Sequence, residues 1–179
     1  MREFGYGLLN YFLFALLGEL LAGFQASLWL HVFGYFPSPY AWVTVLIYWA
    51  LYRSIYEALI MCYLVAFTVA TMTGAPLVSV IGINFTILAV ILLLRNRTLW
   101  SGPNSFMLAA GIAALVIPIA SLVISYFVDR RPVDEFYYYD WILQSLLTSA
   151  FALPLYYLFG FVDRITRREP PKDTESEVM

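Results

Sequence analysis

The sequence predicts an all-α polytopic membrane protein, a bundle of six transmembrane helices in one domain. Hydrophobic residues occupy 62% of the 179 positions and charged residues only 12%, with a mean hydropathy of +0.77. So few charges do not cover a soluble fold of this size. The apolar runs are also long and continuous rather than alternating with period 2, which favours helices over a β-barrel.

The first predicted span is Gly7–Leu30, because a membrane helix needs about 20 apolar residues. Arg2 before this run resembles the start of a signal peptide, but no small-residue cleavage site and soluble segment follow. We therefore expect it to remain as a membrane span. It ends before residues 34–39, where glycine and two prolines predict a loop.

The next apolar stretch, Tyr40–Thr73, is too long for one membrane helix, and Arg53 and Glu57 interrupt it. Arg53 is able to reach the headgroups from the end of a helix by extending its side chain. We therefore divide the stretch into a short span, Tyr40–Tyr52, and a full one, Tyr56–Thr73.

Three further spans complete the predicted bundle, Leu77–Leu94, Ser105–Val128 and Trp141–Phe161. Glycine, proline and arginine residues mark the boundaries between them. The transmembrane domain is thus expected to occupy residues 1–168. Residues 169–179 are rich in proline and charge, which predicts a disordered cytoplasmic tail.

The basic residues predict the orientation of the chain, since Lys and Arg concentrate in cytoplasmic segments. With six spans and the N-terminus inside, the outside segments hold Arg130 and Arg131 alone of the 10 basic residues. One span fewer would place Arg95 and Arg97 outside. The charge pattern therefore favours six spans with both termini in the cytoplasm. The inside residues are Arg2, Arg53, Arg95, Arg97, Arg164, Arg167, Arg168 and Lys172.

Polar side chains within the predicted spans are Glu19, Gln25, Asn84 and Gln144. A charged side chain at the bilayer centre costs roughly 2.5–3.5 kcal/mol. Glu19 is therefore expected to lie between helices, either protonated or hydrogen-bonded, with Asn84 and Gln144 as possible partners. Two interpretations stay open, interhelical hydrogen bonding and a site for a substrate or proton.

Small residues recur every fourth position in the predicted third span, at Cys62, Ala66, Ala70 and Gly74. This spacing places them on one helix face, where they allow close helix packing. Before the last span lies an aromatic cluster that includes Tyr137, Tyr138, Tyr139 and Trp141. It is typical of an interfacial aromatic belt, and a partner-binding surface is the alternative.

Sequence signatures of catalysis are missing. The chain contains no H-E-x-x-H, P-loop or G-x-S-x-G motif. His31 is the single histidine and Cys62 the single cysteine, which excludes a His-rich metal site and an internal disulfide. No basic stripe for nucleic acid is present. We therefore expect neither enzymatic activity nor a cofactor or metal, and no nucleic-acid partner.

Residues 35–168 resemble the bacterial rod shape-determining protein family MreD. A proline-containing loop precedes the short predicted span, which ends near the Tyr48-Trp49 pair typical of that family. The four-spaced small residues then lead to the segment from Thr73 to Leu77. The chain departs from the family pattern of Gly, Gly, Asp and Gly, because Ala70 stands where the family has an intramembrane Asp.

The resemblance implies a non-catalytic membrane scaffold that supports side-wall peptidoglycan synthesis and cell shape. Its expected partners are MreC, the glycosyltransferase RodA and a class B penicillin-binding protein, and its expected location is the bacterial inner membrane. The bundle is also similar to the substrate-binding S components of energy-coupling-factor vitamin transporters. That alternative function requires a polar pocket near the outer face, for which the candidates are Gln25, His31 and Gln144.

Overall fold

The computed structural model describes residues 2–34, 36–95, 102–124, 126–127 and 138–168, and at residues 2–5 and 138 the backbone alone. All regular secondary structure in these ranges is helical, which confirms the all-α prediction. Five of the described helices are long and apolar enough to cross a membrane. The predicted tail and the loop that carries Arg130 and Arg131 lie outside the described residues.

The first span is longer than predicted. Helix α1 (Arg2–Gly23) continues through a π-helical segment, η1 (Phe24–Leu28), into α2 (Trp29–Phe33). Together they form one candidate span, Tyr6–Phe33, of 28 residues. It ends at Gly34, whose φ of +61° is a conformation that side chains with a Cβ rarely adopt.

The short predicted span is a helix of only ten residues, α3 (Val43–Tyr52). At 1.5 Å per residue it is about 15 Å long, half of the hydrocarbon thickness of roughly 30 Å. Every residue from Val43 to Leu51 is buried, so α3 lies inside the bundle. Helix length therefore does not confirm the expected count of six spans.

The segment between α2 and α4 (Ile55–Thr73) runs back along α1. At its start, Trp29 Nε1 donates a hydrogen bond to the carbonyl of Phe36 at 2.9 Å. At its end, the rings of Tyr11 and Trp49 pack with centroids 4.6 Å apart. The non-helical residues 36–42, followed by α3, thus bring the chain back to the end of the bundle at which α1 begins.

Helices α4 and α5 (Leu77–Arg95) form an antiparallel pair. Ser54 and Glu57 form a capping box at the start of α4, in which each side chain bonds the other residue's backbone N–H. Gly74, in the left-handed conformation, ends α4. Close to the middle of the pair, Asn84 Nδ2 donates to the carbonyl of Cys62 at 3.2 Å.

Helices α6 (Gly102–Ile124) and α7 (Tyr138–Ile165) form the most extensively packed pair. Two α7 hydroxyls, of Ser145 and Ser149, donate to α6 carbonyls at 2.9 and 3.0 Å. Small polar side chains at such a contact allow the backbones to approach closely. Helix α7 begins before and ends after the predicted span Trp141–Phe161.

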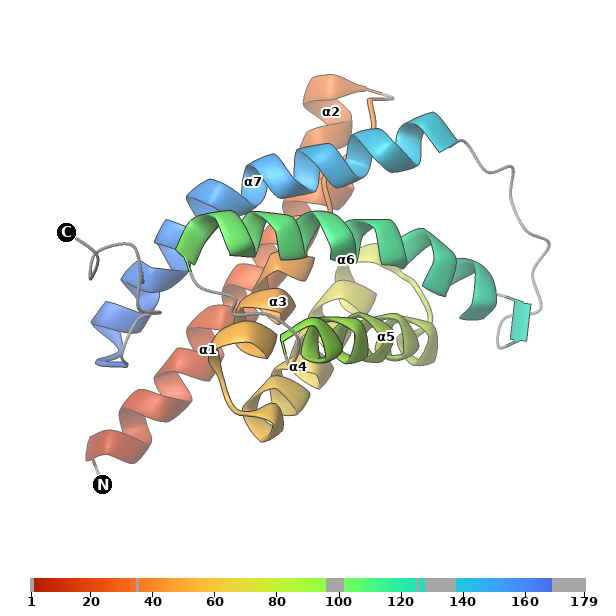
Figure 1. Cartoon of the computed structure of the whole chain (residues 1–179). Coiled ribbons are helices and arrows are strands. Elements are labelled where there is room, and N and C mark those ends of the chain that lie inside the picture. The colour runs from red at the N-terminus through yellow and green to blue at the C-terminus, as the bar shows by residue number, and fades with distance from the viewer. Residues whose placement is uncertain (1, 35, 96–101, 125, 128–137, 169–179) are drawn as a thin grey trace.

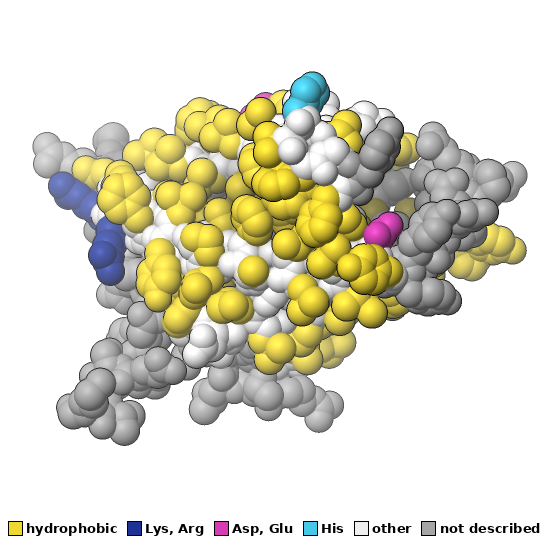
Figure 2. Space-filling view, turned by 90° about the horizontal axis from the view of Figure 1, so that it is seen from above, with side chains coloured by type: hydrophobic (Ala, Val, Ile, Leu, Met, Phe, Trp, Pro, Cys, Tyr) yellow, Lys and Arg dark blue, Asp and Glu magenta, His cyan; other side chains and the backbone are white. Residues whose placement is uncertain are grey.

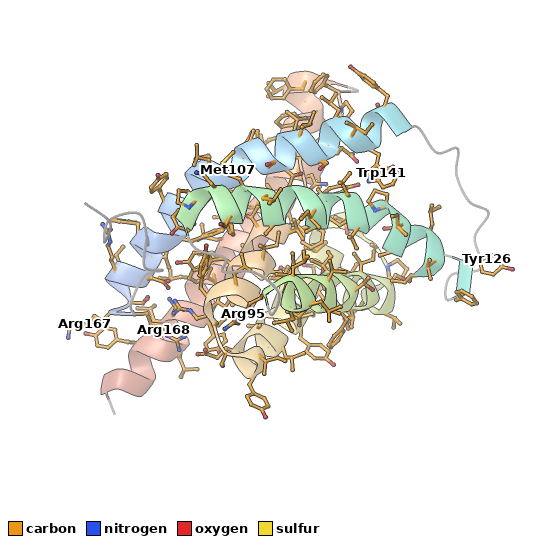
Figure 3. All side chains as sticks on the ribbon, in the orientation of Figure 1. Arg95, Met107, Tyr126, Trp141, Arg167 and Arg168 are labelled. Carbon is orange, nitrogen blue, oxygen red and sulfur yellow. The ribbon has the colours of Figure 1, made fainter. Side chains whose placement is uncertain are left out.

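The helices end at two opposite ends of the bundle. We call one the termini end, because α1 begins and α7 ends on the same side of Figure 1. Figure 3 shows Arg95, Arg167 and Arg168 toward this end, and Tyr126 and Trp141 toward the other, which we call the far end. Helices α1, α4 and α6 run from the termini end to the far end, and α3, α5 and α7 run back.

Aromatic side chains fill the centre of the bundle around Tyr48 of α3. Its ring lies 5.5 Å from that of Phe14, 6.0 Å from Phe106 and 5.2 Å from Phe159. All four side chains are fully buried. Helix α3 thus contributes the residue on which α1, α6 and α7 converge.

The outer surface of the bundle is apolar. Figure 2 shows hydrophobic side chains over much of one face, with Lys and Arg side chains gathered at one edge. Large hydrophobic residues of every long helix are exposed, such as Phe12, Phe67, Leu93, Leu108 and Leu146. Such a surface suits a protein that is surrounded by lipid, as the composition predicts.

Candidate functional site

The side chain of Asp163 lies at the termini end and is completely buried in the last turns of α7. The hydroxyl of Tyr48 donates to its Oδ2 at 2.7 Å, and Asn10 Nδ2 donates to its Oδ1 at 3.0 Å. Arg53 forms an ion pair with the same Oδ1. A buried carboxylate requires this degree of compensation, and here it joins α1, α3 and α7.

Thr166, the residue directly after the helical end of α7, completes this group. Asn10 Nδ2 also contacts the Thr166 hydroxyl oxygen at 2.7 Å, and that hydroxyl donates to the carbonyl of Val162 at 2.9 Å. We call the five residues the termini cluster. They are Asn10, Tyr48, Arg53, Asp163 and Thr166.

A second ion pair lies beside the termini cluster and is more exposed. Arg168 donates to Glu57 Oε1 at 2.7 Å, and about a quarter of each side chain is exposed. Trp49 lies between the two cations, since its ring centroid is 5.8 Å from the Arg53 guanidinium and 5.9 Å from that of Arg168. These contacts are within the range of cation–π attraction.

Arg95 closes the C-terminal end of α3. Its Nη1 donates to the carbonyls of Ala50 and Arg53 at 2.9 and 2.8 Å. The last carbonyls of a helix have no partner within the helix, and a cation there also interacts favourably with the helix dipole. The end of α5 thus holds the end of α3 in place.

The charges of the termini cluster are already paired with each other. Two polar atoms of the cluster, Asn10 Oδ1 and Arg53 Nε, and Nε1 of the adjacent Trp49 are buried without a hydrogen bond among the described residues. The other polar groups of the cluster form hydrogen bonds or ion pairs with one another across α1, α3 and α7. This geometry suits a permanent tie between helices, because it joins α1, α3 and the end of α7.

The polar residues that the sequence singles out do not meet one another. Glu19, Gln25 and Gln144 are half-buried, and no hydrogen bond or ion pair joins Glu19 to any described residue. Asn84 is fully buried and bonds to α4 through Cys62. The expected pairing of Glu19 with Asn84 or Gln144 is therefore absent among the described residues.

The small residues of α4 differ in their environment. Cys62 and Ala66 are completely buried, Ala70 is half-buried, and Gly74 is exposed at the helix end. The first two lie in the packed part of the bundle, as their spacing predicts.

The aromatic cluster before the last span is only partly described. Tyr137 and the side chain of Tyr138 lie outside the described residues. Tyr139 is 76% exposed, whereas Trp141 donates to the carbonyl of Leu115 in α6 at 3.0 Å. Trp141 therefore contributes to α6–α7 packing, while Tyr139 is free to contact an interface or a partner.

Sequence reasoning did not identify the termini cluster. Asp163 precedes Arg164 at the edge of an apolar run, so it resembles an ordinary interfacial residue. One signal was available, because Arg53 interrupts one apolar stretch and Asp163 another, and opposite charges in two spans often pair. Nothing in the spacing of Asn10 or Thr166 indicates their part in it.

Among the described residues, no group of three or more His, Cys, Asp or Glu side chains is placed to hold a metal ion. No family model matches the chain, and neither a curated protein nor a solved structure matches it.

Proposed function

We propose that this chain is a non-catalytic scaffold in the membrane of a bacterial cell-wall elongation complex, where it supports side-wall peptidoglycan synthesis and cell shape. The observation that carries the proposal is the position of α3. This short helix after a proline-containing loop seats Tyr48 and Trp49 in the centre of the bundle. The same short segment with its Tyr-Trp pair is the basis of the resemblance to MreD.

The proposed topology has six crossings with both termini in the cytoplasm of the inner membrane. In it, residues 36–52 form a composite second crossing, part non-helical and part α3. The burial of residues 41–51 among the other helices supports this, because non-helical backbone such as that of Ala41 and Trp42 is tolerated at membrane depth where protein covers it. The described arginines at the termini end, Arg95, Arg167 and Arg168 among them, support a cytoplasmic location of this end.

The test is depletion of the protein in its native bacterium. We expect rod-shaped cells to round up as incorporation of labelled peptidoglycan precursor along the side wall falls. We also expect the tagged protein to co-purify with an MreC-like protein, RodA and the class B penicillin-binding protein. Normal shape together with normal side-wall synthesis after depletion would refute the proposal.

A small-molecule-binding transporter subunit is the second candidate function. The observation that favours it is Gln25, whose Oε1 is buried without a hydrogen-bond partner among the described residues. A native mass spectrum of the purified protein tests it. A bound vitamin-sized molecule that is lost in Gln25→Leu would support this function over the scaffold.

A further inference from the structure

Glu19 is the one acidic side chain near the middle of the first span. The span runs from Tyr6 to Phe33, and Glu19 lies 13 residues after its start and 14 before its end. Its side chain is half-buried, and no described residue forms a hydrogen bond or an ion pair with it. A charged group at this depth costs roughly 2.5–3.5 kcal/mol, and the described part of the chain leaves that cost uncompensated.

Three of the described arginines already have partners elsewhere, and Arg164 and Arg167 lie within four residues of Asp163. Arg53 pairs with Asp163, Arg168 with Glu57, and Arg95 with the end of α3. All of these contacts lie at the termini end, and Glu19 is nine residues, or about 14 Å, along α1 from Asn10. No described cation of this chain is therefore at the depth of Glu19.

The face of α1 that carries Glu19 adjoins the face that packs on α4. On the α4 side, a Cβ added at Gly18 would lie 3.7 Å from Val65, and Ala22 is buried. On the Glu19 side, Leu16 and Leu20 are 40% and 60% exposed. The position four before Glu19 is Ala15, a small residue. The position four after it, Gly23, already faces α4, because a Cβ there would lie 3.8 Å from the Met72 sulfur. A second helix is therefore able to approach α1 closely on the side of Glu19 that carries Ala15, Leu16 and Leu20.

We propose that this face of α1 binds a transmembrane helix of another protein, and that a Lys or Arg near the middle of that helix pairs with Glu19. Charge complementarity identifies the occupant, because a basic side chain at the same depth offsets the desolvation of both charges at once. The inference rests on the proposed function in one respect, that the chain acts by binding membrane partners.

The test uses the full-length protein in its native membrane, with a photo-crosslinking amino acid at Leu16, one turn from Glu19. Leu93 of α5, 66% exposed, serves as the matched control position. We expect the Leu16 probe to give an adduct whose crosslinked peptide is a transmembrane segment containing Lys or Arg. Glu19→Leu should lower the yield on the order of tenfold, which corresponds to about 1.4 kcal/mol. The Leu93 probe should not give this adduct.

A charge exchange provides the second arm. Glu19→Lys should abolish the adduct, and replacement of the partner's basic residue by Glu should restore it in that background. Adducts with lipid alone, adducts with a second copy of this chain, or a yield that Glu19→Leu does not change would each overturn the inference. The thermal midpoint of the purified Glu19→Leu protein should stay equal to or above that of the wild type. A lower midpoint would instead place the partner of Glu19 within this chain.

The two proposals fail in different ways. If the crosslinked partner has no part in cell-wall synthesis and depletion leaves cell shape normal, the scaffold function is refuted while the helix contact stands. If depletion rounds the cells but the Leu16 adduct does not depend on Glu19, the scaffold function stands and the helix contact is refuted.

Discussion

The hydroxyl of Tyr48 in α3 donates a 2.7 Å hydrogen bond to the carboxylate of Asp163 in α7, across 115 positions of sequence. Both side chains are completely buried. The bond ties the short helix α3 to the last helix, α7, and Arg53 adds an ion pair to the same carboxylate. Several measurable consequences depend on this link.

Removal of the carboxylate should be strongly destabilising. Asp163→Ala leaves the Arg53 guanidinium, only 10% exposed, without its counter-charge, and breaking a buried pair in this way costs about 3–5 kcal/mol. Tyr48→Phe removes one hydrogen bond to a charged group and should cost about 1.5–3 kcal/mol. Unfolding of the purified protein in detergent measures both. Equal losses for the two variants would contradict this ranking.

Replacement of both charges should be better tolerated than replacement of one. The double variant Arg53→Met with Asp163→Leu removes the cost of an unpaired buried charge, so it should be more stable than either single variant. The matched control is Glu57→Gln with Arg168→Gln at the more exposed pair. Loss of that pair should cost at most about 1 kcal/mol. A double variant at Arg53 and Asp163 that is as unstable as the sum of its singles would exclude this account.

Arg95 should stabilise α3 through its two carbonyl contacts. Arg95→Met removes charge-assisted hydrogen bonds to Ala50 and Arg53, with an expected cost of about 1–3 kcal/mol. Arg95→Lys retains the charge and should recover part of it. Hydrogen exchange of the amides in α3 reports the effect directly. Unchanged protection in Arg95→Met would show that the C-terminal end of α3 is held by other contacts.

Asn84 should contribute little to stability despite its burial. Its Nδ2 bonds to Cys62, but its Oδ1 has no hydrogen-bond partner among the described residues. Interhelical hydrogen bonds in membranes average about 0.6 kcal/mol, and Leu in its place removes the unpaired oxygen as well. We expect Asn84→Leu to change the unfolding free energy by less than about 1 kcal/mol. A loss of several kcal/mol would show that Asn84 has a further partner.

The proposed topology makes a sharp prediction for reporter fusions. Alkaline phosphatase, which is active only outside the cytoplasm, should be active when fused after Gly74 and inactive when fused after Arg95. A cytoplasmic fluorescent reporter should give the reverse pattern. An active phosphatase after Arg95 would mean that residues 40–73 cross the membrane once, and it would overturn both the six crossings and the cytoplasmic termini.

The helical class and most helix positions followed from sequence because they depend on local hydrophobicity. The turn at Gly74 and the interruption at Arg53 were visible for the same reason. The length of α3 could not be predicted from the sequence. Residues Tyr40 to Trp42 are as apolar as the helix after them, yet they are non-helical. Their conformation depends on a distant contact, the hydrogen bond from the Tyr40 backbone N–H to Thr148.

The site was less accessible from sequence than the fold. Glu19 is recognisable as a candidate because it is a charged residue in the middle of an apolar run. Asp163 lies at the edge of an apolar run, where charged residues are common. Only the tertiary arrangement reveals that the edge position of Asp163 is completely buried. The predicted pairing of Glu19 with Asn84 or Gln144 failed because membership of a span says nothing about which helix faces meet.

The burial of α3 also constrains the order of assembly in the membrane. A ten-residue helix is too short to be stably inserted by itself, and its partners in α6 and α7 are synthesised long after it. The hydrogen bond of the Tyr40 backbone N–H requires Thr148, 108 positions later in the chain, and that of the Tyr48 hydroxyl requires Asp163. The hydrogen bonds that join residues 40–48 to α7 therefore form only after the last helix has been synthesised.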